Sequence, residues 1–215
     1  MARLAAWLGE HSGQAVNKEE IAAAAGHVYS DLASNLVREF TELQGTMGYY
    51  YVRNAGFSET ASRAVGEFYW PVSAKSPIPS SKEGGLVSLA GKLDTLASDF
   101  ALGLIPSGSE DPHGLRRQAL GAVRIVLENG FRLDLKEAAS LAVAGLPCPA
   151  AGDCAGRLLD FVWQRAEAVF ADEGYRFDEV KAVREFFMAG GDLLDCRARI
   201  KDIHALRGNA DFAGI

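Results

Sequence analysis

The near absence of β-strand patterns is the feature that most limits the fold of this chain. No stretch alternates apolar and polar residues for long, and β-branched residues never cluster. Apolar residues recur instead at helical spacing, as Ala61, Val65 and Phe68 do with steps of four and then three residues. The sequence therefore predicts an all-α fold.

Capping residues set the expected ends of the helices. Asn17 and Ser58 are residue types that cap helix N-termini, and Gly130 is of the type that ends a helix. Asp111 is expected to be an N-cap with Pro112 at the first helical position, which proline prefers. We expect helices at about 17–40, 58–70, 84–104, 111–128, 135–144, 154–172, 178–188 and 192–206. They predict a helical bundle over residues 1–145 and a smaller helical extension over 146–215, after the loop 145–152.

Composition excludes several classes of protein. A hydrophobic content of 48% with a net charge of −6 is not the composition of a disordered chain. No apolar run reaches the roughly 18–20 residues of a membrane helix, so we expect no membrane contact. Three cysteines and no signal-peptide pattern predict a cytoplasmic protein without a disulfide framework. The acidic balance argues against a general nucleic-acid coat, but a local basic patch remains compatible with it.

Few residues suggest chemistry by themselves. His27 and Asp31 lie four apart on an expected helix and could both ligate a metal, or they could form an ordinary polar face. Cys148 and Cys154 have a spacing that favours two unrelated loop thiols over a zinc site. We find no complete metal or catalytic set, and the expected metal content is none.

Arginines give the expected helix at 111–128 a positive face. Arg116, Arg117 and Arg124 could bind phosphate oxygens, or they could pair with carboxylates inside the bundle. Gly108 precedes them between two serines, as in an anion-binding loop, but the nearby acidic residues favour a simple turn that Asp111 caps. The three arginines are therefore our candidates for nucleic-acid contact.

Four ordered motifs resemble one family, the β subunit of the bacterial two-subunit glycine–tRNA ligase (glycyl-tRNA synthetase). The motifs are residues 37–48 (VREFTELQGTMG), 67–71 (EFYWP), 89–96 (LAGKLDTL) and 103–117 (GLIPSGSEDPHGLRR). The motif residues that we single out are Glu39, Glu42, Gln44, Gly45, Lys92, Asp94, Gly108 and Asp111.

The resemblance implies that the chain is a fragment of a longer subunit, with an HD-domain-like helical bundle. In this family the α subunit activates glycine with ATP, and the β subunit binds the tRNA. The implied partners are therefore tRNA(Gly), the α subunit and the rest of the β subunit. The whole ligase uses ATP and magnesium, whereas this fragment is expected to need no cofactor and to be inactive alone.

Three residues depart from the family pattern, and two of these departures, Phe68 and Gly91, concern the metal site of an HD-type fold. Phe68 stands where the family has histidine, Gly91 where it has aspartate, and Tyr29 where it has lysine. Phenylalanine and glycine cannot ligate a metal, so hydrolysis is not expected. The alternative function is a metal-dependent HD-type phosphohydrolase acting on nucleotides, in which His27, Asp31 and Asp94 would have to be the ligands.

Two further expectations concern the motif residues. Lys92 and Asp94 lie on an otherwise apolar helix and are expected to form a buried pair. The motif at 39–48 is expected to be a packed helix that ends at Gly45 to Gly48.

Overall fold

The computed structural model describes residues 1–106, 111–147, 150 and 152–207. Every regular element in these ranges is a helix, which confirms the all-α prediction. The α-helices are α1 (Ala2–His11), α2 (Lys18–Ala25), α3 (Asn35–Glu39), α4 (Thr46–Asn54), α5 (Glu59–Gly66), α6 (Lys82–Ala101), α7 (Leu115–Asn129), α8 (Leu135–Ala144), α9 (Cys154–Asp172), α10 (Phe177–Ala182), α11 (Arg184–Met188) and α12 (Leu193–Arg207).

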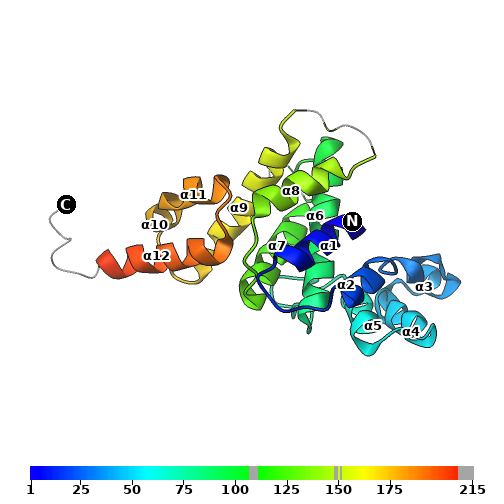
Figure 1. Ribbon diagram of the computed structural model, residues 1–215. Helices are drawn as coiled ribbons and strands as arrows, with labels where there is room; N and C mark the ends of the chain where they lie inside the picture. Colours follow the sequence, from blue (N-terminus) through cyan, green and yellow to red (C-terminus); the bar gives the residue numbers. More distant parts are fainter. Residues whose placement is uncertain (107–110, 148–149, 151, 208–215) are drawn as a thin grey trace.

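Helix α6 is the centre of the fold. Helices α1, α2, α5, α7, α8 and α9 all pack against it, so that its residues are buried on several faces. Figure 1 shows α6 and α7 behind α1 in the middle of the molecule.

Helix α9 extends from the central bundle to the group formed by α10, α11 and α12 (Figure 1). Its side chain Trp163 is fully buried, with its ring centroid 5.0 Å from that of Phe187 on α11. Because α9 also packs on α6, α7 and α8, it joins this group and the central bundle in one hydrophobic core. The division at residue 145 and the HD-like label stay predictions.

The continuous helix expected over 17–40 is wrong. Asn17 caps α2 as predicted, but α2 ends at Ala25, and a 3₁₀ turn (Ser30–Ala33) precedes α3. Asp31 lies in that turn, where its buried carboxylate accepts the backbone N–H of Gly45 at 2.6 Å. This long-range hydrogen bond turns the chain back on itself, and helical periodicity carries no information about it.

The motif at 39–48 is also different from its prediction. Residues 41–43 form a 3₁₀ turn, and Gly45 precedes α4 instead of ending a helix. Gly45 has φ 80°, which glycine adopts at no steric cost, and its Cβ would lie 2.6 Å from the backbone oxygen of Gly66. The motif therefore joins two packed segments.

Other helix ends differ by a few residues. Ser58 caps α5 as predicted, but this helix ends at Gly66, and the helix expected at 178–188 is divided into α10 and α11. The asparagine-glycine end of α7 is confirmed, because Gly130 follows Asn129 in the left-handed conformation.

Candidate nucleic-acid interface

The first turn of α7 presents two of the candidate arginines. Gly114 is its N-cap with φ 66°, so Asp111 and Pro112 lie before the helix, and the predicted N-cap position is wrong. The Asp111 carboxylate nevertheless accepts the N–H groups of Leu115 at 2.8 Å and Arg116 at 3.0 Å. It satisfies two donors that would otherwise have no partner in the helix. The expected loop glycine, Gly108, lies outside the described residues.

Arg117 is exposed in this first turn. Its guanidinium lies over Gly114, where a Cβ would be 3.3 Å from one of its terminal nitrogens. Within the described ranges, Arg117 forms no ion pair and donates no hydrogen bond. It is the candidate arginine that is best placed to bind an external anion.

Arg124 is used inside the protein. Its side chain is only 17% exposed and its Nε lies 2.7 Å from a carboxylate oxygen of Glu128. One terminal nitrogen donates to the backbone oxygens of Ser76 at 2.8 Å and Ser73 at 3.3 Å. Arg124 thereby fixes the loop before α6 onto α7.

A further arginine, Arg165 on α9, lies near the start of α7. It interacts electrostatically with Arg116 and Asp111, and its guanidinium carbon is 5.4 Å from the Phe161 ring centroid. Burial, followed by the positive charge of Arg116, lowers the pKa of Arg165. Its Nε is buried without a hydrogen-bond partner among the described residues. The sequence pattern could not find this residue, because helical spacing does not show which helices are neighbours.

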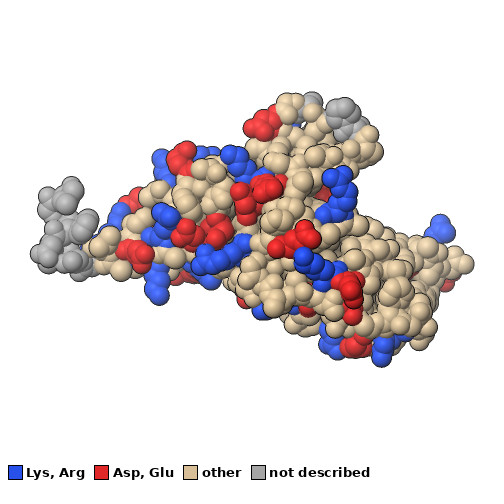
Figure 2. All heavy atoms as spheres, in the orientation of Figure 1, with Lys and Arg blue, Asp and Glu red and all other residues tan. Residues whose placement is uncertain are grey.

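The surface carries both signs of charge. Figure 2 shows Lys and Arg side chains interspersed with Asp and Glu over α10, α11 and α12, without a broad area of one sign on this face. An anion-binding site on this protein is therefore a local one, consistent with the net charge of −6.

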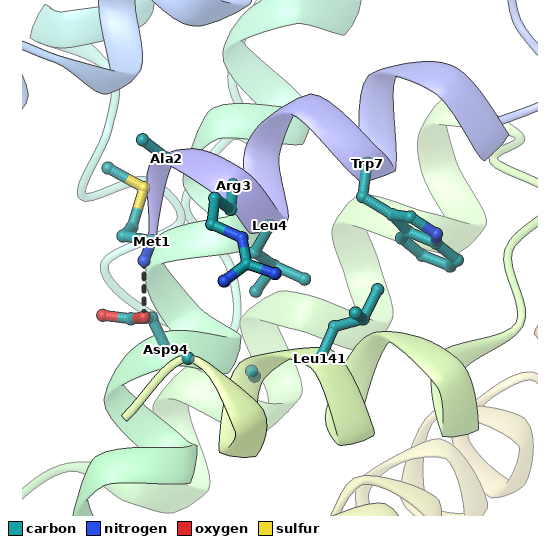
Figure 3. A pocket seen from close by; sticks show the side chains of 9 residues that line it. Met1, Ala2, Arg3, Leu4, Trp7, Asp94 and Leu141 are labelled. Atoms are coloured by element: carbon teal, nitrogen blue, oxygen red, sulfur yellow. Dashed lines mark ion pairs between the residues drawn. The ribbon is translucent and has the colours of Figure 1, made fainter. Parts of the chain in front are cut away.

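The predicted Lys92–Asp94 pair is wrong. Asp94 pairs instead with the Met1 amino group, 2.8 Å away, at the edge of a pocket between α1, α6 and α8 (Figure 3). Lys92 is 4% exposed, and its Nζ lies 3.5 Å from both the Tyr69 backbone oxygen and Gln118 Oε1. Burial lowers the pKa of Lys92 to about 8. Residues two apart point to different sides of a helix, which explains why the pair does not form.

Lys92 lines a pocket of 130 Å³ that also contains the three departures from the family pattern, Tyr29, Phe68 and Gly91. The Phe68 ring lies over Gly91, where a Cβ would overlap two of its carbon atoms. Tyr29 contacts the same ring edge-on, with 5.2 Å between the centroids. The three departures therefore lie together in space, and the absence of a side chain at Gly91 leaves room for the Phe68 ring.

A family model described as "Glycyl-tRNA synthetase beta subunit" matches residues 1–185. The chain belongs to the glycyl-tRNA synthetase beta subunit family. This confirms the resemblance that the four motifs indicate.

Beta subunits of glycine–tRNA ligase from three bacteria are similar to nearly the whole chain. The protein of Solidesulfovibrio magneticus is 40% identical over 97% of this chain, and that of Pseudomonas fluorescens is 39% identical over 100% of this chain. The protein of Azotobacter vinelandii is 41% identical over 93% of this chain. The matched regions are 30%, 31% and 29% of these relatives, so the chain spans about a third of their length.

The residues of this beta-subunit chain do not fit the metal centre that an HD-type hydrolase requires. His27 Nδ1 lies 2.8 Å from the Ala23 backbone oxygen, Asp31 binds Gly45 N–H, and Asp94 pairs with the amino terminus. The described ranges contain no group of three His, Cys, Asp or Glu side chains that could hold a metal ion.

The remaining motif residues of the beta-subunit chain lie mainly at its surface. Glu39, Glu42 and Gln44 are exposed around the 3₁₀ turn at 41–43, whereas Gly45 is buried.

None of the helices in the described part of the chain has both the length and the apolar character for crossing a membrane.

Proposed function

We propose that this chain takes part in glycyl-tRNA formation as a non-catalytic helical unit of the ligase beta subunit. In this proposal the first turn of α7 contacts the tRNA backbone through Arg117, beside Arg116 and Arg165. Family membership supports the role in the ligase. The contact is assigned to Arg117 because its side chain is exposed and has no carboxylate partner in the described ranges.

The arginine side chains at the start of α7, rather than the helix end itself, support this contact. Helix N-termini favour anions, because their first N–H groups lack partners in the helix and the helix dipole is positive there. The Asp111 carboxylate already occupies two of these N–H groups as an internal anion, so the arginine side chains and not the helix end would bind an external phosphate. Arginine can then bind a phosphate oxygen, and such contacts supply affinity and position without reading sequence.

The proposed partners are tRNA(Gly), the ligase α subunit and the remainder of the beta subunit. We assign the use of ATP and magnesium to those other parts, and expect no aminoacylation by this chain alone. Two cysteines, Cys154 and Cys196, are buried free thiols, which is typical of a reducing compartment and supports a cytoplasmic location.

Charge reversal of Arg117 tests the contact. We expect Arg117→Glu to weaken tRNA(Gly) binding about tenfold at low salt, because a phosphate contact is replaced by repulsion. Fluorescence anisotropy with labelled tRNA(Gly) measures the dissociation constants, and circular dichroism checks that the variant remains folded.

Lys201→Glu provides a matched control. Lys201 is exposed on α12, so its reversal changes the net charge equally at a different surface. We expect Lys201→Glu to change the affinity for tRNA(Gly) by less than about twofold, which is much less than the effect of losing a phosphate contact. Equal losses in the two variants would contradict a specific contact at α7.

A further inference from the structure

Lys92 is a buried ammonium group that lacks a counter-ion among the described residues. It is 4% exposed, and the only cause that changes its pKa is burial, since no carboxylate acts on it. Its two hydrogen-bond acceptors, a backbone oxygen and the Gln118 side-chain oxygen, are both neutral and both 3.5 Å away. Buried charges in proteins are normally paired, so Lys92 lacks the direct counter-ion that such a group usually has.

The position of Lys92 is fixed by the packing of its aliphatic stem. A Cβ at Gly121 of α7 would lie 2.8 Å from Lys92 Cε and 3.4 Å from Pro71 Cγ. The absence of a side chain at Gly121 thus lets the stem pass between α7 and Pro71. The ammonium group is held beside the pocket rather than extending into solvent.

The neighbouring tyrosines do not supply the missing charge. Burial raises the pKa of Tyr69 to about 12, and burial followed by the charge of Asp94 raises the pKa of Tyr29. Both phenols therefore remain protonated at neutral pH. The Tyr69 hydroxyl donates to the Val28 backbone oxygen at 3.5 Å, whereas that of Tyr29 can donate to a bound anion.

The pocket beside Lys92 has room and donors for a small anion. Its volume of 130 Å³ corresponds to about four water molecules at roughly 30 Å³ each. Tyr29, Thr95 and Gln118 line it, and each carries a donor group. Ser88 also lines it, but its hydroxyl donates to the Trp70 backbone oxygen at 2.6 Å.

We propose that this pocket binds a small oxyanion of the size of phosphate, with the Lys92 ammonium group as its counter-ion. The anion pairs directly with the Lys92 ammonium group, which no carboxylate of the described residues does, and the hydroxyl and amide donors bind its remaining oxygens. The site uses other side chains than the proposed tRNA contact, although Gln118 follows Arg117 in α7, and its test does not require tRNA.

Isothermal titration calorimetry of the 215-residue chain tests this site. Inorganic phosphate and acetate are titrated separately at constant ionic strength, so that the tighter ligand distinguishes a tetrahedral oxyanion from a carboxylate. We expect saturable one-to-one binding of at least one of them. We expect Lys92→Met to weaken this binding at least about tenfold, because hydrogen bonds to charged groups are the strong ones.

Two further variants make the result decisive. Lys201→Met removes an exposed lysine and should leave anion binding unchanged. Thr95→Val keeps the side-chain shape, removes one hydroxyl donor and should weaken binding several-fold, which gives a second test if Lys92→Met does not fold. Absence of saturable binding, or equal binding by the wild type and a folded Lys92→Met variant, would overturn the proposal.

Discussion

Replacement of Gly91 by alanine is expected to lower the free energy of unfolding by about 1–3 kcal/mol, the typical cost of overpacking a core. Helix propensity alone predicts the opposite, because alanine is favoured over glycine inside a helix by about 1 kcal/mol. The steric effect is larger here, since the new Cβ would overlap the Phe68 ring. Urea unfolding followed by circular dichroism measures the change.

The sign of this effect should depend on Phe68. In a Phe68→Ala background the ring is absent, so Gly91→Ala should stabilise the protein by about 1 kcal/mol through helix propensity. Gly26→Ala is the control, because its Cβ would meet no atom closer than 3.6 Å. Stabilisation by Gly91→Ala in the wild type would contradict the packing of Phe68 against Gly91.

The Trp163→Ala variant is expected to lose about 3–5 kcal/mol of stability, the cost of removing a large buried aromatic side chain. Trp163 is fully buried, its ring packs near Phe170 and Phe187, and its Nε1 donates to Glu167 at 2.7 Å. The variant would therefore leave a cavity between α9 and α11. Urea unfolding is again the measurement.

A surface-proximal tryptophan serves as the comparison for this variant. Trp7 is only partly buried and stacks on His11, with 4.5 Å between the ring centroids. Trp7→Ala should cost less than half as much as Trp163→Ala. A loss below about 1 kcal/mol for Trp163→Ala would be the cost of an ordinary mutation and would contradict its central packing role.

Local sequence signals were sufficient for much of the fold. Asn17, Ser58 and Gly130 set helix ends through hydrogen bonds and backbone conformations within a few residues, and these ends are confirmed. The prediction failed at 17–40, where the side chain of Asp31 binds a backbone group 14 residues away. A local pattern contains no information about such a partner.

The candidate site shows the same division between local and long-range information. The arginines of α7 were evident from the sequence, but the neighbouring Arg165 and the internal partners of Arg124 depend on how helices and loops pack. Likewise, Lys92 and Gln118 come from different helices, so the pocket between them follows only from the tertiary structure.

The salt dependence of tRNA(Gly) binding tests the central claim, an electrostatic contact at the start of α7, most directly. Affinities of the wild type, Arg117→Ala and Lys201→Ala are measured over a series of salt concentrations. We predict a linear fall of log affinity with log salt concentration, and a slope about one unit shallower for Arg117→Ala, because one phosphate contact is removed. Binding without salt dependence, or the same slope in all three proteins, would contradict this account.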